Sequence, residues 1–454
     1  MNTIASHSPQ NPDDVVVVAN RMSADDVVAG FAQAREAQRQ WWAMGAAGRS
    51  AALHAAAEAL AARADEATDL VVREVGKPLA EAKGEVARGV SILRYYAQAS
   101  FMPKGDVFPP SAGAMLWSER RPHGVAGLIT PWNFPVAIPL WKAAPALCAG
   151  NAVVMKPSQD AIACALFLQD VLAPHLPAGL FQVVVGGGSD VGNALTANAD
   201  CISFTGSTGV GRQIAQTAVA RNVPVQAEMG GLNAAIVLPD ADYEKTAAII
   251  AGASMWFAGQ KCTATSRVIV VGDGDFATPF IKAVEALKMG DPASADVTVG
   301  PLINEASLRD FNAALDNARA SGGTILTGDA PSDGLFVKPV VIEGLPADHP
   351  LSCNEVFGPI VTLHRAATAE EAMALANSVQ YGLVTGIHGR DLNAVTSLAS
   401  QAHSGLVKIN ASTSGVDFYA PFGGEKMSSY GMREQGLAAL DFYSHTVTVT
   451  LAQH

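Results

Sequence analysis

The feature that most constrains the fold is the regular alternation of short apolar strands with helices from residue 124 onward. The first series opens with GVAGLIT (124–130) and ends near residue 229, and a second begins after about residue 231. Strands that alternate with helices in this way are typical of parallel, doubly wound sheets. The chain has 454 residues, whereas a single core stops growing at about 250–300 residues. We therefore predict an α/β protein with two domains that join near Gly230–Gly231.

Charge and cysteine usage exclude several classes of protein. The formal net charge is -12 and the pI is about 5.3, which disfavours nucleic acid and anionic membranes as partners. Five cysteines without a CxxC pair make a poor disulfide framework and suggest no metal site. The first residues lack a basic start and an apolar core, and prolines interrupt the long apolar run 125–155, so we expect a cytoplasmic protein without a membrane segment.

Glycine-rich turns follow two of the predicted strands. SFTGSTGVGRQIAQ (203–216) has the form of a strand, a turn and a helix start, where backbone N–H groups make a phosphate site. Ser207 is in position to cap that helix. VVVGGGSDVG (183–192) is a second such turn, and Lys156 in MKPS follows a third strand. Alone, the 203–216 turn fits an ordinary capped helix equally well, and Lys156 fits a surface lysine better. Together they favour a dinucleotide site at the carboxyl ends of the strands.

Three further residues have the chemistry of an active site. Cys262 in FAGQKCTATSR is either a nucleophile or a buried small side chain. Asn133 lies between two prolines in TPWNFP, which suits either a held oxyanion donor or a rigid loop. Glu228 in QAEMGG follows a strand and is either a general base or a solvated carboxylate.

The ordered set of motifs resembles the aldehyde dehydrogenase superfamily from about residue 10 to residue 454. The motifs that carry this resemblance are PWNFP, VVMKPS, FTGST, EMGG followed by GQKC, NEVFGP (354–359) and PFGGEKMSS (421–429). The resemblance implies a Rossmann-type cofactor domain (1–106 and 125–229), a catalytic domain (230–442) and a β-arm for oligomerisation (107–124 and 443–454). It also implies a homodimer or homotetramer.

The family's catalytic roles carry over to matching residues. The resemblance implies that Cys262 attacks the aldehyde to form a thiohemiacetal, whose oxyanion lies between the Asn133 amide and the Cys262 N–H. Glu228 matches the general base that hydrolyses the thioester, which favours a free carboxylic acid as product. Lys142 resembles a member of a proton relay, and Glu434 resembles another across a one-residue offset at Met432.

The resemblance also implies a nicotinamide cofactor. Glu355 resembles the carboxylate that binds the nicotinamide ribose, and Phe357 lies beside it. Relatives that prefer NAD often carry a glutamate where this chain has Gln159, so the sequence slightly favours NADP over NAD. The cofactor-binding residues implied by the resemblance are Ile129, Thr130, Trp132, Lys156, Ser158, Gln159, Gly188, Gly192, Phe204, Gly206, Ser207, Val210, Glu355 and Phe357.

The expected substrate is a small aldehyde. Several stretches are similar to α-ketoglutaric semialdehyde (2,5-dioxovalerate) dehydrogenases, with 2-oxoglutarate as the implied product. Succinic semialdehyde enzymes usually have an arginine where this chain has Trp141. The partner of a substrate carboxylate therefore stays open, with Lys261 and Arg433 as candidates. The expected substrate-tunnel residues are Phe134, Trp141, Trp256, Lys261 and Phe422. Dehydrogenases of aromatic or aliphatic aldehydes, or of succinic or glutaric semialdehyde, are the alternatives, and a non-catalytic binding protein is less favoured.

Overall fold

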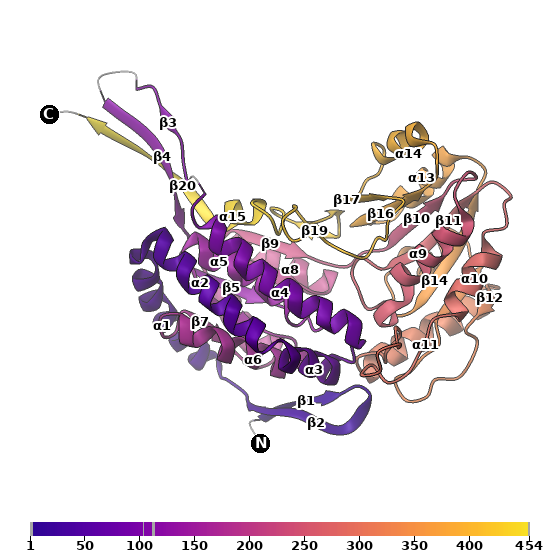
Figure 1. The fold of residues 1–454 in the computed structure, drawn as a ribbon, viewed down its shortest axis with the longest axis horizontal. Helices are drawn as coiled ribbons and strands as arrows, with labels where there is room; N and C mark the ends of the chain where they lie inside the picture. The colour runs from indigo at the N-terminus through magenta and orange to yellow at the C-terminus, as the bar shows by residue number, and fades with distance from the viewer. Residues whose placement is uncertain (1–2, 103, 111–113, 453–454) are drawn as a thin grey trace.

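The computed structural model describes residues 3–102, 104–110 and 114–452, which form two lobes, a projecting arm and an N-terminal hairpin (Figure 1). The strands of the first lobe are β5 (Val125–Ile129), β6 (Ala152–Lys156), β7 (Phe181–Val183), β8 (Cys201–Thr205), β9 (Val225–Glu228) and β19 (Ser429–Tyr430). They form one sheet in the order β19-β9-β8-β5-β6-β7. The β19 strand pairs antiparallel with β9, and the other pairs are parallel.

Helices cover both faces of this sheet. They are α1 (Ala24–Ala43), α2 (Gly45–Ala62), α3 (Ala64–Val75), α4 (Leu79–Ala99), α5 (Ala137–Ala149), α6 (Ile162–Leu172), α7 (Asn193–Asn198) and α8 (Thr208–Ala220). The α1, α7 and α8 helices contact one face, α5 and α6 contact the other, and α2 and α4 pack outside α5. Because β5, β6 and α5 are covered on all sides, their sequences are almost wholly apolar.

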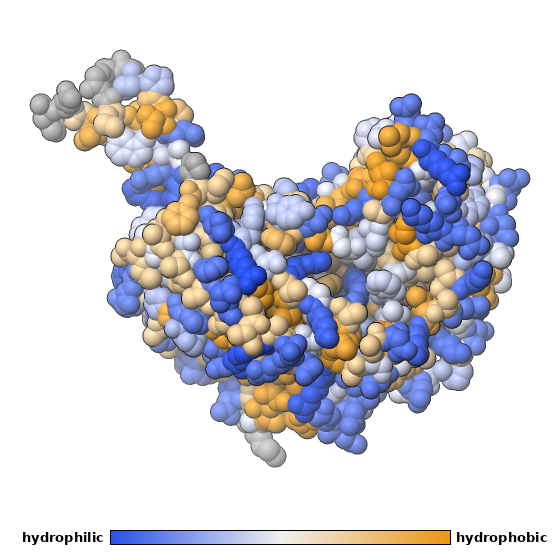
Figure 2. All heavy atoms as spheres, viewed as in Figure 1, coloured by the Kyte–Doolittle hydropathy of each residue, from blue (hydrophilic) through white to orange (hydrophobic). Residues whose placement is uncertain are grey.

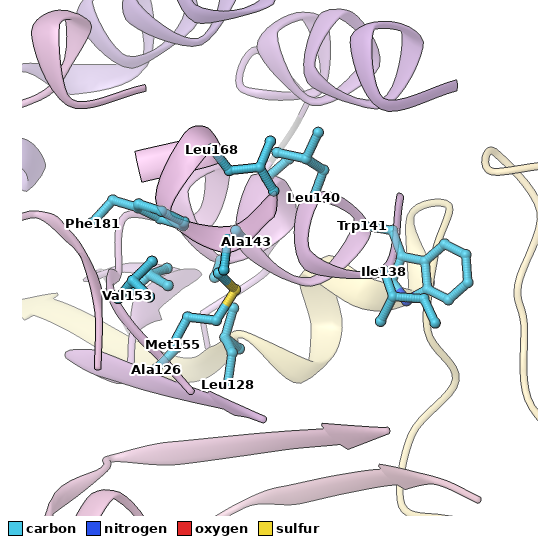
Figure 3. Packing of buried hydrophobic residues seen from close by; sticks show 14 of the residues in the cluster. Ala126, Leu128, Ile138, Leu140, Trp141, Ala143, Val153, Met155, Leu168 and Phe181 are labelled. Carbon is cyan, nitrogen blue, oxygen red and sulfur yellow. The ribbon is translucent and has the colours of Figure 1, made fainter. Parts of the chain in front are cut away.

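The core of the first lobe lies between the sheet and α5. Figure 3 shows side chains of α5 meeting those of β5, β6, β7 and α6 in this layer. The labelled residues are Ala126, Leu128, Ile138, Leu140, Trp141, Ala143, Val153, Met155, Leu168 and Phe181. The α5 helix contains Pro145 and stays helical, and it ends at Gly150, whose φ of 103° suits a residue without a Cβ.

The second lobe has a seven-stranded sheet of order β12-β13-β14-β11-β10-β16-β17. The bounds of these strands are β10 (Asn233–Val237), β11 (Thr265–Val271), β12 (Thr324–Thr327), β13 (Val340–Glu343), β14 (Ile360–Ala366), β16 (Val384–His388) and β17 (Leu406–Ile409). Only the β12–β13 pair is antiparallel among the described pairs of this sheet. The two predominantly parallel sheets confirm the predicted α/β fold class.

The helices of the second lobe are α9 (Tyr243–Met255), α10 (Ala277–Glu285), α11 (Glu305–Ala320), α12 (Pro350–Cys353), α13 (Ala369–Asn377) and α14 (Leu392–Ala399). The α9 and α10 helices pack on one face of the sheet, and α13 and α14 on the other. A small pair, β15 (Tyr381–Gly382) and β18 (Glu425–Lys426), lies beside it. The chain then returns to the first lobe, since β19 joins its sheet and α15 (Ala438–Phe442) contacts α5. The catalytic domain was expected to extend to residue 442, whereas β19 and α15 pack with the first lobe.

The arm consists of β3 (Val107–Phe108), β4 (Ala114–Pro122) and β20 (Ser444–Ala452). It projects from the first lobe and carries exposed apolar side chains (Figure 2). Among these, Val107 is 82% exposed and Met115 is 60% exposed. Of the arm expected at 107–124 and 443–454, residues 111–113 and 453–454 lie outside the described residues.

The N-terminal hairpin was not predicted from the sequence. Its strands are β1 (Thr3–Ser8) and β2 (Asn11–Asn20), which pair antiparallel. Ser6 in β1 donates to the buried carboxylate of Glu74, which ties the hairpin to α3. In the part of the chain that the structure describes, no helix is both long enough and apolar enough to cross a membrane.

Candidate active site

Cys262 follows a strained turn between the two lobes. After α9, a short 3₁₀ segment (η4, Trp256–Gly259) contains three consecutive left-handed residues, with φ of 57° at Phe257, 53° at Ala258 and 67° at Gly259. A left-handed conformation costs a residue with a side chain about 1–2 kcal/mol. Strain of this kind persists where the surroundings impose it and is frequent at functional sites. The turn brings the partly exposed Cys262 to the wall of a large cavity.

This cavity has a volume of about 590 Å³ and lies between α4, α5 and α9. It gathers all of the expected substrate residues, Phe134, Trp141, Trp256, Lys261 and Phe422, around Cys262. The rings of Trp141 and Phe422 lie 5.9 Å apart between centroids. A cavity of this size with apolar walls and a few charged groups is typical of a small-molecule site.

The thiol of Cys262 lies in a negative environment. Desolvation raises the pKa of this thiol well above its usual value, and the carboxylates of Glu355, Glu228 and Glu434 raise it further. Because the thiolate is the reactive form of cysteine, Cys262 needs a base to remove its proton in this state of the protein.

Asn133 lies next to the cysteine loop. Its buried amide donates from Nδ2 to the carbonyl of Gln260 at 3.0 Å, two residues before Cys262. A side-chain amide carries two N–H donors, so the second is available to a bound oxyanion. The start of α5 fixes this loop, since Glu85 accepts hydrogen bonds from the N–H groups of Val136 (2.8 Å) and Ala137 (3.0 Å).

Glu228 ends β9 and is only 3% exposed. Its Oε2 accepts a hydrogen bond of 2.5 Å from Ser429 on β19, and its Oε1 has no partner among the described residues. Desolvation raises the pKa of Glu228 well above its usual value, as does nearby Glu434, whereas Ser429 and Lys142 act in the opposite direction. A buried carboxyl with a raised pKa and a free oxygen suits the transfer of a proton.

Lys142 and Glu434 form an ion pair with side chains 1% and 2% exposed. Lys142 Nζ also donates to Ser203 at 2.8 Å, and the indole Nε1 of Trp141 donates to Glu434 Oε2 at 2.8 Å. The structure thus brings together the two residues expected in a proton relay, despite the offset at Met432. Ser203 extends the network by a hydrogen bond of 3.1 Å to Gln226.

A second cavity, of about 380 Å³, opens at the carboxyl ends of β5 and β6. It gathers five of the expected cofactor residues, Ile129, Lys156, Gly188, Gly192 and Val210. Lys156 lines this cavity, is buried and donates to the carbonyl of Pro157 at 3.1 Å, which leaves two of its three N–H donors without a partner among the described residues. A Cβ on Gly188 would meet nothing within 4 Å. The residues present therefore fit a dinucleotide.

Other expected cofactor residues lie around this cavity rather than in its wall. Ser158 caps a 3₁₀ turn (η1, Gln159–Ala161) in which Gln159 is exposed. Ser207 occupies the predicted N-cap position of α8. Its side chain makes no capping hydrogen bond in the described structure, so the predicted capping contact is wrong. Phe204 is 3% exposed and belongs to the core, and Gly206 leaves room for its ring.

Trp132, Phe357 and Glu355 lie near the cysteine loop, since the Trp132 ring also meets that of Phe257 and the Glu355 carboxylate acts on the Cys262 thiol. The Trp132 ring meets Phe357 edge to face, 5.7 Å between centroids, and Thr130 begins the same loop. Glu355 accepts a hydrogen bond of 3.1 Å from the N–H of Gly231, and desolvation raises its pKa to about 7.

The paired glycines after Glu228 allow this close approach. A Cβ on Gly230 would meet the carboxylate of Glu355, and one on Gly231 would lie 2.6 Å from the carbonyl oxygen of Cys262. The EMGG motif is therefore required for the packing of the two lobes at the site.

The candidates for a substrate carboxylate have other partners. Lys261 pairs with Glu81 of α4, and Arg433 donates to the carbonyl of Gly424 and does not line the large cavity.

The face of α4 that borders the cavity was not predicted from the sequence. Glu81, Glu85 and Arg88 all line it. Their spacing of four and three residues places them on one side of a helix, which is the sequence signal that was available.

Comparisons with known proteins agree with this geometry. The model of the Aldehyde dehydrogenase family matches residues 1–449. The Alpha-ketoglutaric semialdehyde dehydrogenase of Bacillus subtilis (strain 168) is 38% identical, and the match covers 97% of this chain and 93% of that protein. The 2,5-dioxopentanoate dehydrogenase of Saccharolobus solfataricus is 34% identical, with 97% and 95% covered.

Solved structures overlap almost completely with this one. An NADP dependent enzyme of E. coli superposes with a TM-score of 0.96 at 33% identity, covering 99% of this chain and 95% of that one. Betaine aldehyde dehydrogenase of Staphylococcus aureus in complex with NAD+ has a TM-score of 0.96 at 28% identity, with 99% and 91% covered. The whole-chain match and these overlaps confirm the resemblance inferred from the motifs: the chain belongs to the aldehyde dehydrogenase family and is an oxidoreductase that acts on aldehydes with a nicotinamide cofactor.

Proposed function

We propose that this chain oxidises α-ketoglutaric semialdehyde to 2-oxoglutarate and releases it as the free acid. The observation that carries the proposal is the 590 Å³ cavity, which exposes Cys262 between aromatic walls and a charged face of α4. The names of the relatives from Bacillus subtilis and Saccharolobus solfataricus support this substrate. A short, carboxylated aldehyde fits a cavity that combines apolar walls with charged groups.

The proposed chemistry begins at Cys262. The Cys262 thiol transfers its proton to a solvent water, its Sγ forms a bond to the aldehyde carbon as the C=O π bond breaks, and the new oxyanion accepts hydrogen bonds from Asn133 Nδ2 and the Cys262 N–H. A bound nicotinamide supplies the acceptor for the hydride that leaves this carbon. Glu228 then removes a proton from water, which attacks the thioester on Cys262 and releases the carboxylic acid and the thiolate. The orphan Oε1 of Glu228 is the atom that receives this proton.

Lys142 and Glu434 are proposed to carry that proton away from Glu228. Both are buried, and both influence the pKa of Glu228 through their charges. Ser203 and Gln226 continue the network on the side of the sheet. A chain of buried groups with coupled charges is suited to a proton relay.

We infer that NADP is accepted at least as well as NAD. Gln159 carries no charge that would repel a 2′-phosphate. Lys156 lines the cavity and has two N–H donors without a partner among the described residues. The remaining cofactor residues, Thr130, Ser158, Gly206 and Ser207, lie on the loops around it, and Glu355 with Phe357 is proposed to hold the nicotinamide end.

A homodimer or homotetramer that pairs through the arm is part of the proposal. Val107, Phe108, Met115 and Leu451 are exposed apolar residues on the arm (Figure 2), and such patches mark protein interfaces. Light scattering after size-exclusion chromatography measures the mass directly. A monomer at micromolar concentration would contradict this part.

A second candidate is the oxidation of uncharged aromatic or aliphatic aldehydes. The four rings of Phe134, Trp141, Trp256 and Phe422 in the cavity wall favour it. One experiment separates the two: the formation of NADH and NADPH is followed with α-ketoglutaric, succinic and glutaric semialdehydes, benzaldehyde and propanal. We expect the highest kcat/KM with α-ketoglutaric semialdehyde, whereas a preference for benzaldehyde or propanal contradicts the proposed substrate.

A further inference from the structure

The α4 helix presents a charged face to the substrate cavity. Glu81, Glu85 and Arg88 lie within two turns of this helix, and all three line the cavity beside Lys261. Together with Lys261, they are the charged residues that line this cavity in the described part of the chain. The charge that a bound substrate meets therefore depends on how these groups are paired.

Two of the three α4 groups are neutralised by lysines. Glu81 forms an ion pair with Lys261. Glu85 forms one with Lys77, whose side chain is 0% exposed. Lys77 also lies over the ring of Phe134, 3.7 Å from its centroid. The two pairs cancel, so neither lysine offers a free positive charge to a ligand.

Arg88 is left over. It is half-buried at the cavity wall, and no hydrogen bond or ion pair joins it to another residue in the described ranges of the chain. Several other arginines of the first lobe have carboxylate partners, such as Arg94 on the same helix with Glu58 and Arg63 with Asp170. An arginine fork matches a carboxylate in a bidentate geometry. Because Glu81 and Glu85 are neutralised by lysines, the positive charge of Arg88 is the net charge of the cavity wall.

The position of Arg88 along α4 fits a short acid. Glu81 pairs with Lys261, the residue before Cys262, and Arg88 lies seven residues further along the helix, about 10 Å at 1.5 Å per residue. In α-ketoglutaric semialdehyde, four carbon–carbon bonds separate the aldehyde from the carboxylate. The length of this substrate and the length of an arginine side chain together span the rise of about 10 Å along α4 from Glu81 to Arg88.

The surroundings of Cys262 also require a cation elsewhere. Glu228, Glu355 and Glu434 are carboxyl groups that act on the Cys262 thiol, and the nearby Lys142 is already paired with Glu434, so the reacting end of the cavity offers no free cation to an anionic substrate. Trp256 and Phe422 line other parts of the cavity and bring no charge. Arg88 is the unpaired cation in the described lining of the cavity that can bind the acid while the aldehyde is held at Cys262.

We propose that Arg88 binds the carboxylate of the substrate and thereby makes the cavity selective for short aldehydes with a terminal acid. This rests on the proposed function, because it assumes a carboxylated aldehyde as substrate. In this proposal Arg88 replaces Lys261 and Arg433 as the group that recognises the acid.

The test compares Arg88→Gln with the unchanged protein on two substrates, α-ketoglutaric semialdehyde and uncharged pentanal. Losing a charge-assisted hydrogen bond of this kind costs about tenfold to about a hundredfold in affinity. We expect KM for the semialdehyde to rise by that factor with kcat largely retained, and KM for pentanal to stay the same. Arg88→Lys should recover part of the loss. With pentanal as reporter, competitive inhibition by 2-oxoglutarate should weaken in Arg88→Gln by a similar factor.

Arg94→Gln is the matched control. It removes the same charge from the same helix, but Arg94 pairs with Glu58 away from the cavity, so both KM values should be unchanged. If the unchanged protein shows no preference for the semialdehyde over pentanal, the proposed substrate fails and the inference falls with it. If the preference exists and survives in Arg88→Gln, the Arg88 assignment alone is wrong. An equal loss on both substrates also overturns it.

Discussion

The indole N–H of Trp141 holds the carboxylate of Glu434 at 2.8 Å, across 293 positions of sequence. The ring of the same tryptophan lines the substrate cavity. Trp141 therefore joins the substrate site to the buried pair of Lys142 and Glu434. One side chain serves as apolar wall on one side and as hydrogen-bond donor on the other.

Trp141→Phe keeps an aromatic wall and removes this donor. We expect the free energy of unfolding to fall by about 1–3 kcal/mol, because a buried carboxylate oxygen loses its partner. Urea denaturation measures the change. Trp256→Phe is the control, since Trp256 lines the same cavity but is 42% exposed, and a change within about 0.5 kcal/mol is expected there. Equal effects of the two substitutions would contradict the role of the indole N–H.

Glu228→Gln should separate the two halves of the reaction. The first turnover still forms the reduced cofactor, whereas the thioester is hydrolysed slowly because water has lost its base. Steady-state turnover is expected to fall by about 10²- to 10⁴-fold, with a rapid burst of reduced cofactor retained in stopped-flow absorbance. An unchanged steady-state rate would show that another group acts as the base.

Two cysteine variants complete that experiment. Cys262→Ala should give neither burst nor turnover, because no sulfur remains to attack the aldehyde. Cys353→Ala changes a partly exposed thiol outside both cavities and should leave the burst intact. Activity in Cys262→Ala would overturn the assignment of the nucleophile.

Glu355 should make the stability of the cofactor-free protein depend on pH. Burial raises its pKa from 4.5 to about 7, so the folded state binds a proton that the unfolded state releases. The contribution of Glu355 is fully present below about pH 4.5 and is lost as the pH rises to about 7. The melting temperature of Glu355→Gln, relative to the unchanged protein, should therefore increase between pH 5 and pH 8. A constant difference across this range would contradict the raised pKa.

Glu85→Gln should destabilise the support of the oxyanion loop. The substitution leaves the charge of Lys77 buried without a counter-charge, and breaking a buried pair costs about 3–5 kcal/mol. Denaturant unfolding measures this loss. Glu58→Gln breaks the exposed pair with Arg94 on the same helix and should cost less than about 1 kcal/mol. Similar losses for both would show that Lys77 finds another partner.

Much of the fold, and the candidate residues Cys262, Glu228 and Asn133, can be predicted from the sequence alone. The period of apolar residues determines which segments are strands and which are helices, and these properties are local. The motifs around Cys262, Glu228 and Asn133 specify local backbone conformations, such as the glycine pair at 230–231, so short stretches were enough to find them. The expected family and fold class are confirmed on this basis.

Partner choice was decided only in three dimensions. No local pattern shows that Glu81 neutralises Lys261, that Glu85 neutralises Lys77, or that Arg88 is left without a partner. The return of β19 to the first sheet and the left-handed turn at Phe257–Gly259 are also outside the reach of periodicity. The physical reason is that a charged side chain is paired by whatever the packing of distant elements brings within hydrogen-bond distance. The sequence by itself therefore determined the elements and the candidate reacting residues, and the tertiary structure decided which charges remain free for a substrate.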